Sequence, residues 1–586
     1  MTDRNRMVHI RCEKDDPDLD DSRWPRRARA RTPDPSDMSQ APRIESERPQ
    51  SAKGRPRFAM VYVDVPISCE GPAFHYEIPV SLLDDIRIGS RVRVPFGKRK
   101  VDGWVAGFVD VPEVESVKPV LSVLDRESSL DEGAFDLARR VAERYQCPLS
   151  EVIKAMVPAY TRNPPTGRHP KSVTVTGLGS SCTPATPQGT DAQAGSGGDI
   201  LSPGSRVFLT PDQGRAVERI RRVQRERRHA VFVLFGVTGS GKTEVYLKAM
   251  EEALSEGRQA LMLVPEIALT PQTVDRLRSR FGAEVAVLHS GISRREGYET
   301  YKRVRSRDAR VVLGARSAVF APCPDPGVIV LDEEHEFTYK QSEEPRYHAR
   351  EVAIMKSNRV GGVTILGSAT PSIETFYKAK KGEYELVTLP SRIKGLGLPN
   401  VHIVDMRKVF GSGSKGVISP VLRTKIEETL SRGAKVILFV NRRGYSPFVL
   451  CRECGYVERC PNCKVSLTFH LKERAMICHY CGYRKRPPEK CPACGGGGIK
   501  LFGVGTERVE EAVKVAFKDA NVARLDSDTT TKRGAHRVIL DGFRKGPVNV
   551  LVGTQMVAKG LDISEVSLVG VISADTTLYL PDFRAA

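Results

Sequence analysis

The sequence predicts an α/β protein with two parallel-sheet lobes, a cysteine-rich insert in the second lobe and a small β-rich domain before the first. Short apolar runs separated by helical stretches predict the lobes, because strands buried on both faces of a parallel sheet read as continuous apolar segments. Eight of the 13 cysteines lie between Cys451 and Cys494, and they define the insert. Alternating basic and apolar residues in Arg91–Phe96 predict a half-buried strand of the N-terminal domain.

These patterns divide the chain into segments. The expected order is a disordered segment (1–56), a β-rich domain (57–125), a helical connector (126–160), a linker rich in Gly, Ser, Pro and Thr (161–208), lobe 1 (209–395), lobe 2 (396–448 and 498–586) and, within lobe 2, a cysteine module (449–497). The runs expected as lobe strands are Val231–Phe235, Leu261–Val264, Val285–Leu288, Val311–Leu313, Val328–Leu331, Val363–Leu366, Val436–Val440, Val550–Val552 and Leu568–Ile572. Ala134 to Met156 has apolar residues near helical spacing and predicts the connector helix.

Composition restricts the class of protein. The 586 residues include 91 Lys and Arg against 71 Asp and Glu, a formal net charge of +20. This excess favours a polyanionic partner, although a solvated basic surface gives the same count. No run is long enough for a membrane span and the N-terminus lacks the apolar core of a signal peptide, so we expect a cytoplasmic protein with no membrane partner. Cysteines in that reducing compartment indicate metal ligands or buried thiols.

A phosphate-binding loop follows the first expected strand of lobe 1. Gly236-Val237-Thr238-Gly239-Ser240-Gly241-Lys242-Thr243 fits the pattern GxxxxGK[ST]. Gly236, Gly239 and Gly241 let backbone N–H groups approach phosphate oxygens at a helix N-terminus. Lys242 is expected to reach the β- and γ-phosphates of ATP, and the Thr243 hydroxyl is expected to bind Mg²⁺.

An acidic cluster is expected to complete this nucleotide site. The strand Val328–Leu331 runs into Asp332-Glu333-Glu334-His335. Asp332 is predicted to hold Mg²⁺ and Glu333 to polarise the attacking water, which makes them catalytic candidates together with Lys242. His335 either senses the γ-phosphate, the interpretation we favour, or caps the turn locally. Gln213, upstream of the P-loop, is predicted to read adenine.

Polar residues also follow other expected strands. The segments are Pro265–Gln272, Gly314–Ala318, Gly367–Pro371 and, in lobe 2, Gly553–Gly560. Because ligands of open α/β sheets bind at the carboxyl ends of strands, these segments are expected at the edge that carries the P-loop. Their small hydroxyl residues and backbone amides suit phosphodiester oxygens.

Aromatic and basic residues interleave directly after the acidic cluster. The candidates for DNA contact are Phe337, Tyr339, Lys340, Arg346, Tyr347, His348 and Arg350. Such a mixture suits base stacking combined with phosphate pairing. The alternative is that the aromatic rings pack beneath the edge of the lobe.

The cysteines of the insert form four CxxC pairs. They are Cys451 and Cys454, Cys460 and Cys463, Cys478 and Cys481, and Cys491 and Cys494. Eight thiolates supply two tetrahedral S₄ sites, so we expect two Zn²⁺ ions per chain. Spacing alone does not decide which pairs share an ion. His470 and His479 are expected at the surface, because the thiolates already complete both sites.

The order of these motifs resembles superfamily 2 helicases. The wording PEIALTPQ, LHSG, DEEH, RYHAR, GSATPS, NRRGY, GTER and GTQMVAKG resembles, within them, the PriA family of replication-restart helicases (primosomal protein N′). The resemblance implies two RecA-like lobes, a β-rich N-terminal domain that binds DNA 3′ ends, and ATP-dependent 3′→5′ movement on single-stranded DNA. It implies branched and single-stranded DNA, single-strand-binding protein and primosome or helicase-loading proteins as partners, and we expect a monomer. It also implies a nested zinc pairing, with the outer CxxC pairs on one ion and the inner pairs on the other.

Several positions depart from the family pattern. Pro345 replaces a Trp in the segment that the family uses as an aromatic-rich loop, and His75 replaces an Asp that contacts the terminal nucleotide. The sequence gives no reason to expect an intact winged helix. The chain stops before a QVAGRAGR-like motif, so we expect a C-terminally truncated protein with slower hydrolysis. A motor-defective, zinc-stabilised DNA-binding scaffold is therefore the alternative to an active helicase. A double-strand translocase would fit the lobes but not the four CxxC pairs.

Overall fold

The computed structural model describes residues 57–65, 73–124, 130–157, 208–440 and 448–574, with short gaps inside these ranges. The gaps are 115, 266–270, 290, 394–396, 398, 412–415, 452, 471–472, 498, 503–504, 527–528, 531–534, 555–556, 558–562, 564 and 573. The predicted disorder at 1–56 and the linker up to residue 207 lie outside the described residues. No helix of the described ranges has the length and apolar composition needed to cross a membrane.

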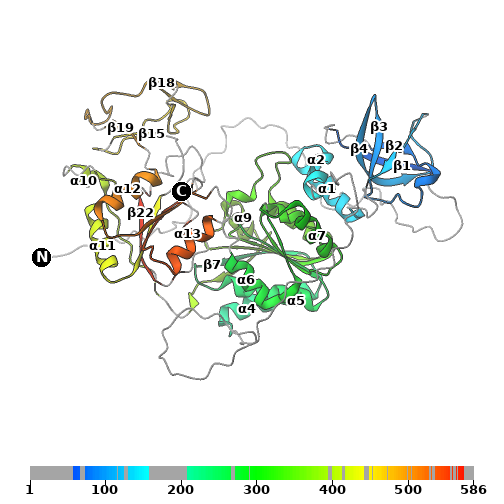
Figure 1. Ribbon diagram of the computed structural model, residues 1–586, viewed down its shortest axis with the longest axis horizontal. Coiled ribbons are helices and arrows are strands. Elements are labelled where there is room, and N and C mark those ends of the chain that lie inside the picture. Colours follow the sequence, from blue (N-terminus) through cyan, green and yellow to red (C-terminus); the bar gives the residue numbers. More distant parts are fainter. Residues whose placement is uncertain are drawn as a thin grey trace, which may run out of the picture. The chain divides into compact units, whose positions relative to one another are not determined.

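The N-terminal domain is a six-stranded sheet in the order β5-β2-β1-β4-β3-β6 (Figure 1). The strands are β1 (Phe58–Val63), β2 (Phe74–Glu77), β3 (Arg91–Phe96), β4 (Arg99–Val109), β5 (Lys118–Pro119) and β6 (Ser122–Val123), with a short 3₁₀ turn, η2 (Val80–Leu82). Alternate residues of β1, among them Ala59, Val61 and Val63, are buried in its core. The strand predicted at Arg91–Phe96 is present, and it turns into β4 at Gly97, whose φ of 59° favours glycine.

The connector contains two helices, where the sequence predicted one segment. They are α1 (Glu132–Tyr145) and α2 (Leu149–Met156). The Asp131 side chain accepts a hydrogen bond from the Ala134 N–H at 2.7 Å, which caps the start of α1. Gln146 has a left-handed φ of 50° and Pro148 follows, so the helix stops and restarts after a turn.

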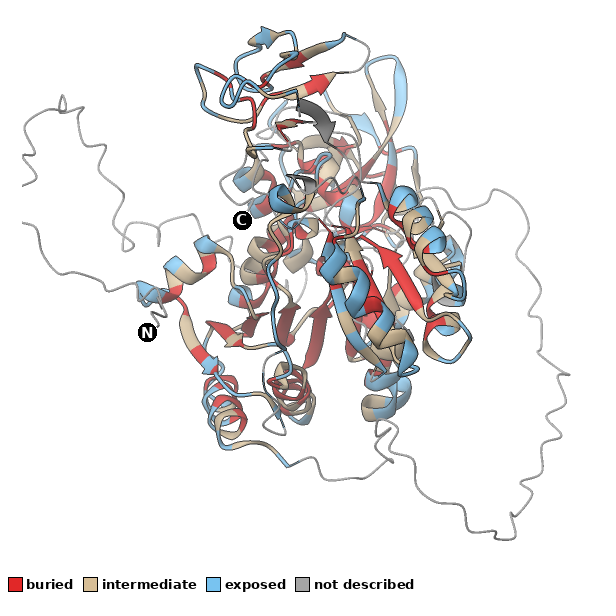
Figure 2. Cartoon of the chain, turned by 90° about the vertical axis from the view of Figure 1, so that its left-hand side faces the viewer, coloured by how far each residue is buried: buried red, intermediate tan, exposed pale blue. Residues whose placement is uncertain are grey.

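Lobe 1 is built on a seven-stranded sheet in the order β13-β7-β12-β11-β8-β10-β9, with every described pairing parallel. Figure 2 shows its strands coloured as buried. The strands are β7 (Ala230–Gly236), β8 (Gln259–Leu263), β9 (Val285–Leu288), β10 (Val311–Gly314), β11 (Pro326–Asp332), β12 (Val363–Ser368) and β13 (Glu385–Leu389). All six predicted lobe-1 strands are present. The strand β13 was not predicted because it lies at the sheet edge, is only partly buried and has no continuous apolar run.

Helices cover both faces of this sheet. They are α4 (Pro211–Arg225), α5 (Lys242–Ser255), α6 (Pro271–Phe281), α7 (Arg294–Arg305), α8 (Ala349–Arg359) and α9 (Ile373–Lys380), with the 3₁₀ turns η4 (Gly282–Glu284), η5 (Arg316–Phe320) and η6 (Phe337–Tyr339). Alternate residues of each strand enter different cores. Val231 and Val233 pack in one core and Phe232 and Leu234 in the other. Burial on both faces explains why these strands read as apolar runs.

Lobe 2 carries a four-stranded parallel sheet in the order β20-β21-β14-β22. Its strands are β14 (Lys435–Val440), β20 (Val522–Leu525), β21 (Val550–Gly553) and β22 (Val566–Ile572), and its helices are α10 (Met406–Gly411), α11 (Pro420–Ser431), α12 (Thr506–Ala516) and α13 (Ala535–Arg544). The three strands predicted here are present. The edge strand β20 was not predicted, since three of its four residues are only partly buried.

The cysteine module interrupts lobe 2 with two small antiparallel sheets. One pairs β15 (Phe448–Cys451) with β19 (Ile499–Phe502), and the other contains β16 (Thr468–His470), β17 (Ala475–Ile477) and β18 (Arg484–Lys485). Its described apolar core is small: Val449, Leu467, Phe469 and Met476 pack with Cys460 and Cys478. So little buried surface does not hold a fold of this size without a metal or cross-link.

Candidate functional site

The P-loop lies between β7 and α5 as predicted. Gly239 and Gly241 have φ values of 81° and 76°, which side chains with a Cβ rarely adopt. A Cβ at Gly236 would stand 2.5 Å from the Ser240 Oγ, so the turn has no room for one. The Lys242 Nζ donates to the Gly236 carbonyl at 2.9 Å, which keeps the ammonium inside the loop. Backbone N–H groups at the start of α5 therefore form a concave anion site.

Gln213 supports this loop from beneath. Its side chain is buried, its Oε1 accepts from the Thr210 N–H at 2.9 Å, and its Nε2 donates to the Ser240 carbonyl at 2.9 Å. Both polar atoms are therefore paired within the protein. In this structure Gln213 therefore supports the P-loop, and its contact with adenine stays a prediction.

The acidic cluster stands at the carboxyl end of β11, two strands from β7 in the sheet. The Asp332 Oδ1 accepts a hydrogen bond from the Tyr246 hydroxyl at 3.0 Å, and Tyr246 belongs to the helix that begins at the P-loop. Burial, and next the charge of Glu333, raise the pKa of Asp332 to about 6. Glu333 itself has a left-handed φ of 48°. Tyr246 was not predicted, because in the sequence it has only the pattern of a core residue.

His335 points to the next strand of the sheet. Its Nδ1 is 2.8 Å from the Oγ of Ser368, which ends β12 within the predicted GSATP segment. The ring also lies 3.6 Å from a Glu333 carboxylate oxygen. His335 therefore joins the end of the acidic cluster to the end of β12. This contact agrees with a local capping role, and the γ-phosphate role stays a prediction.

Glu334 anchors a buried polar network that sequence reasoning missed. Its carboxylate is fully buried and accepts from the Arg350 Nη1 at 3.0 Å, the Ser372 N–H at 2.6 Å and the Thr375 Oγ1 at 2.9 Å. The Arg350 Nη1 also donates to Ser372 and Thr375. These partners come from the acidic turn, the start of α8 and the start of α9. The Arg350 guanidinium neutralises a buried carboxylate in this structure, and its contact with DNA stays a prediction.

We expect Arg350→Ala to destabilise lobe 1 strongly. Removing one partner of a buried ion pair costs about 3–5 kcal/mol, since the remaining charge is left without compensation. Chemical denaturation should therefore show a clearly lower midpoint. The matched control is Arg346→Ala, which removes an exposed arginine four residues away and should change stability by no more than about 0.5 kcal/mol. Equal midpoints for the two variants would contradict the buried pair.

The aromatic-basic loop, residues 337–350, forms a short hairpin. Lys340 and His348 face each other in an antiparallel bridge, and the Gln341 N–H donates to the Tyr347 carbonyl at 2.8 Å. Arg316, on η5, holds the loop from outside: its Nη1 donates to the carbonyls of Thr338 and Lys340 at 3.1 and 3.0 Å. These hydrogen bonds stabilise the hairpin conformation of the loop.

Only part of this loop is available for stacking or phosphate contact. Phe337 is 70% exposed, and Lys340 and Arg346 are also exposed. Tyr339 is fully buried and its hydroxyl donates to the Asp332 carbonyl at 2.7 Å and to the Leu263 carbonyl at 3.0 Å. Tyr347 is buried against Phe320, with ring centroids 4.8 Å apart. Neither ring is exposed to a base in this structure, and a DNA contact by either tyrosine stays a prediction.

His348 caps the helix that follows the loop. Its Nδ1 accepts from the Arg350 N–H at 3.2 Å, at the start of α8. Burial, and next the charge of Arg350, lower its pKa to about 4, so the ring is neutral near pH 7. The neutral ring caps the start of α8 through Nδ1, and a DNA contact by His348 stays a prediction.

Several predicted motif positions lie outside the described residues. They are 266–270 of the PEIALTPQ segment, Ser290 of LHSG, 441–445 of NRRGY and most of 555–560 in GTQMVAKG. Thr506 of GTER is described: its hydroxyl donates to the Asp526 Oδ2 at 2.6 Å, at the end of β20.

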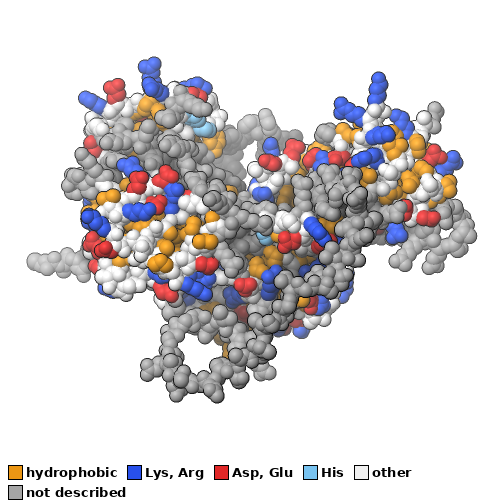
Figure 3. All heavy atoms as spheres, in the orientation of Figure 1, with side chains coloured by type: hydrophobic (Ala, Val, Ile, Leu, Met, Phe, Trp, Pro, Cys, Tyr) orange, Lys and Arg blue, Asp and Glu red, His pale blue; other side chains and the backbone are white. Residues whose placement is uncertain are grey.

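In the N-terminal domain the His75 Nδ1 accepts from the Glu113 N–H at 3.0 Å, whereas Lys98, Arg99 and Lys100 are exposed at the β3–β4 turn. Figure 3 shows basic side chains gathered over this domain.

The eight cysteines assemble into two clusters of four. Cys451, Cys454, Cys491 and Cys494 form one, and Cys460, Cys463, Cys478 and Cys481 form the other, each with all Sγ atoms within 4.8 Å of one another. This is the nested arrangement that the resemblance implied. Four thiolates so close together repel one another unless a cation lies between them, and four sulfur donors are the set that structural Zn²⁺ prefers. The donor sets therefore fit two zinc ions.

Each CxxC pair adopts the same turn. The residue four positions after the first cysteine donates its N–H to that cysteine's carbonyl at 2.8–2.9 Å and has a left-handed φ of 59–79°; these residues are Gly455, Lys464, Gly482 and Gly495. Three of the four are glycine, which adopts this φ without strain. In the inner cluster the Tyr483 N–H lowers the pKa of Cys481, whereas the neighbouring Cys481 raises the pKa of Cys463. The sequence CxxCG alone predicts this geometry at three positions.

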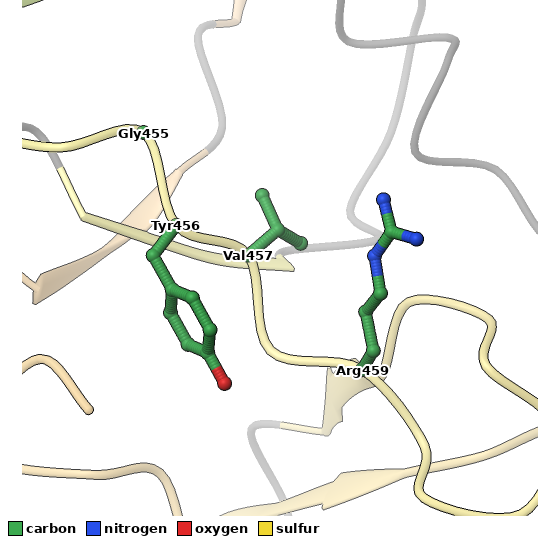
Figure 4. Close-up of a pocket in the computed structure, with 4 residues that line it drawn as sticks. All are labelled: Gly455, Tyr456, Val457 and Arg459. Carbon is green, nitrogen blue, oxygen red and sulfur yellow. The ribbon is translucent and has the colours of Figure 1, made fainter. Parts of the chain in front are cut away.

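The remaining polar features of the module lie apart from these sulfurs. His470 and His479 stack, with 3.0 Å between their Nε2 atoms. A pocket of about 380 Å³ is lined by Gly455, Tyr456, Val457 and Arg459 (Figure 4), and it contains no residue of the nucleotide site.

Comparison with known families matches four parts of the chain. Residues 60–158 match a PriA 3′DNA-binding domain (3′BD), 210–379 a DEAD/DEAH box helicase, 460–486 the PriA DNA helicase Cys-rich region (CRR) domain, and 496–581 a helicase conserved C-terminal domain. The α1 and α2 helices fall within the first match. The acidic turn and the aromatic-basic loop fall within the second.

Known proteins with similar sequences include replication restart proteins from several bacteria. The replication restart protein PriA of Treponema pallidum (strain Nichols) is 37% identical over 529 residues, which covers 89% of this chain and 75% of that protein. PriA of Haemophilus influenzae is 33% identical over 570 residues, covering 87% and 76%. PriA of Bacillus subtilis (strain 168) is 49% identical over 378 residues, covering 64% of this chain and 47% of that protein. The match thus spans about half the length of the Bacillus relative.

Solved structures match less closely. RecG bound to a three-way DNA junction is 17% identical, with a TM-score of 0.37, over 62% of this chain and 38% of that chain.

Proposed function

The chain belongs to the PriA family of replication restart proteins, and from this premise we propose that it is an ATP-dependent DNA helicase that acts at stalled or abandoned replication forks. We propose that it moves 3′→5′ on single-stranded DNA and starts primosome assembly. The observation that carries the proposal is the hydrogen bond between Tyr246 and Asp332. It joins the helix that begins at the P-loop to the end of the strand that supplies the acidic cluster.

The residues of this edge have distinct roles in the proposal. Backbone N–H groups of Gly236, Gly239 and Gly241 and the Lys242 ammonium bind the phosphates of ATP. Asp332 and the Thr243 hydroxyl hold Mg²⁺, which supplies charge neutralisation when it is bound. Glu333, at the tip of the turn, orients the attacking water. His335, held against Ser368, carries the state of this site to the end of β12.

We propose that DNA contacts the exposed part of the aromatic-basic loop. Phe337 offers a ring for base stacking, and Lys340 and Arg346 offer charge to phosphates. The exposed basic turn of the N-terminal domain supplies a second DNA surface, in keeping with its 3′-end-binding family match. The net charge of +20 favours both contacts.

We further propose partners and setting from family membership. They are branched and single-stranded DNA, single-strand-binding protein and primosome or helicase-loading proteins, with the chain itself a monomer. Eight reduced cysteines in two clusters fit the reducing cytoplasm, where we place its action.

Steady-state ATPase measured with and without single-stranded DNA tests the proposal. We expect DNA to stimulate hydrolysis, and we expect a partial duplex to be unwound only when its single-stranded arm permits 3′→5′ movement. ATP binding without any DNA stimulation would reject the motor and favour a zinc-stabilised DNA-binding scaffold. Unwinding with the opposite polarity would reject the direction alone.

The raised pKa of Asp332 predicts a pH-dependent magnesium site. Because a proton competes with Mg²⁺ for the carboxylate, the Mg²⁺-dependent part of nucleotide binding should weaken below about pH 6, roughly tenfold per pH unit. The nucleotide titrates too, so the informative comparison is with Glu333→Gln. This variant removes a charge that raises the pKa of Asp332. The pH below which Mg²⁺ no longer strengthens nucleotide binding should therefore be lower in the variant than in the wild type. Titrations of a fluorescent nucleotide analogue with Mg²⁺ or EDTA measure this, and identical pH profiles would contradict it.

A further inference from the structure

The C-terminal end of α1 contacts the stem of the aromatic-basic loop, by which we mean the paired residues Lys340 and His348. The Tyr145 hydroxyl accepts a hydrogen bond from the His348 N–H at 3.0 Å. The Lys340 Nζ lies 5.0 Å from the centroid of the Tyr145 ring, within the range of a cation–π contact. Lys340 and His348 are the two residues that face each other in the stem of the hairpin. One tyrosine side chain therefore contacts both strands of the stem.

The residue before Tyr145 contacts the helix that follows the loop. The Arg144 Nη2 lies 3.6 Å from the Glu351 Oε2, in the first turn of α8. Apolar residues on the same face of α1, among them Val141 and Ala142, share a core with Val352 and Ala353 of α8. The end of α1 is thus packed as part of lobe 1, so that movement of α1 has to displace the loop.

The same two-helix connector is attached to the N-terminal sheet. The Ser150 Oγ in α2 donates to the Val65 carbonyl at 3.4 Å, and Lys154 forms an ion pair with Asp64. Trp104 of β4 is buried in the core that contains α1 and α2. The connector, which lies within the match to the 3′DNA-binding domain, therefore contacts the N-terminal sheet through α2 and the aromatic-basic loop through α1.

We propose that Tyr145 is a positioning residue that couples the N-terminal DNA-binding domain to the aromatic-basic loop. Binding of a DNA 3′ end at the N-terminal domain shifts the connector, and Tyr145 transmits the shift to the stem at Lys340 and His348. Tyr339 and Glu334 then extend the same path to the acidic cluster, through the Tyr339 hydrogen bond to the Asp332 carbonyl and the ion pair between Arg350 and Glu334. The inference rests on the proposed function, since it assumes that lobe 1 hydrolyses ATP.

Tyr145→Phe tests the coupling with the smallest possible change. It keeps the ring and its contact with Lys340 but removes the only acceptor that the structure gives the His348 N–H. Tyr384→Phe is the matched control: the Tyr384 hydroxyl accepts from Lys378 at 3.0 Å and its ring carries the same lysine at 5.0 Å, and neither contact involves the loop. Hydrolysis by the full-length chain is measured without DNA, with a fork whose nascent strand ends in a 3′ hydroxyl, and with the same fork lacking that strand.

We expect Tyr145→Phe to retain basal hydrolysis and 3′-end binding but to lose at least about fivefold of the extra stimulation that the 3′ end provides, the lower end of usual coupling between sites. Tyr384→Phe should behave as wild type. Full 3′-end stimulation in Tyr145→Phe would overturn the inference while the proposed function stands. Wild-type protein without any DNA stimulation would overturn the proposed function, and the inference with it. Loss of basal hydrolysis in Tyr145→Phe would show that the hydroxyl has only a structural role, which also overturns the inference.

Hydrogen exchange gives a readout that does not depend on hydrolysis. An oligonucleotide with a 3′ hydroxyl, bound to wild-type protein, should change amide exchange in residues 340–351, and Tyr145→Phe should abolish that change. A structural hydroxyl would leave exchange insensitive to the oligonucleotide in both proteins. That result would reject the coupling.

Discussion

Lys242→Ala is expected to abolish ATP hydrolysis while DNA binding persists. The Lys242 ammonium extends along the P-loop to the Gly236 carbonyl, inside the concave site at the start of α5. No other described lysine lies on the P-loop itself, so the charge that develops on the phosphates in the transition state would lose its nearest cation. The loss of one neutral hydrogen-bond donor to a transition state lowers kcat by about 10²–10³-fold. Lys242 carries a full positive charge, so we expect its loss to lower kcat by at least this factor.

The control for this variant stands on the same helix. Lys248 lies two turns further along α5 and pairs with Glu251 at 3.0 Å, away from the loop. Lys248→Ala should leave hydrolysis within about twofold of wild type, since a partly exposed pair of this kind contributes little to stability and lies outside the phosphate site. Steady-state phosphate release and fork binding by fluorescence anisotropy measure the two properties. If hydrolysis survives in Lys242→Ala, the phosphate site lies elsewhere in the chain.

The second large effect is expected from zinc. Wild-type protein should contain two ions per chain, and Cys460→Ser or Cys451→Ser should each remove one, because three thiolates hold the ion far more weakly than four. Apparent binding free energies of structural zinc sites are about 10–16 kcal/mol, which exceeds the stability of most whole domains. The small apolar core of the module cannot replace that contribution, so loss of an ion should unfold the cluster around it.

The buried thiol Cys147 provides the control. It packs in the core shared by α1 and lobe 1 and belongs to neither cluster, so Cys147→Ser should retain both ions. Atomic emission measures the zinc content, and limited proteolysis between residues 449 and 497 measures the folding of the module. A wild-type content of one ion or none would refute the assignment of eight thiolate ligands. A Cys460→Ser variant with two ions would refute the inner cluster.

The strands of the lobes were predictable because they are buried on both faces. Val231–Phe235 and Val328–Leu331 have no polar residue to interrupt the run, and both occur as β7 and β11. The edge strands β13 and β20 escaped prediction for the complementary reason. Glu385 and Arg524 face solvent in part, so neither strand forms an apolar run. The break between α1 and α2 escaped because apolar spacing continues across Gln146 and Pro148 even though the backbone does not.

The nucleotide and metal sites were predictable to the extent that they are local in sequence. A P-loop needs its glycines, lysine and threonine within eight consecutive positions, and a CxxC turn needs four. Both patterns survive in the sequence because backbone geometry within one turn requires them. The aromatic-basic loop was predicted as a segment, but the sequence does not show which of its side chains point to solvent and which point into the core. Burial separates Phe337, Lys340 and Arg346 from Tyr339 and Tyr347.

The sequence alone therefore determined the lobes, the P-loop, the acidic turn and the eight sulfur ligands, since each depends on residues close together in the chain. The tertiary structure decided which distant residues support them. Tyr246 meets Asp332 across 86 positions, Thr375 meets Glu334 across 41, and Tyr145 meets His348 across 203. Nothing in local spacing reports such contacts, because they follow from how the strands are ordered in the sheet and how the connector packs against it. The same packing gives Gln213, Arg350 and the two tyrosines internal contacts that support the site, which their sequence neighbours do not reveal.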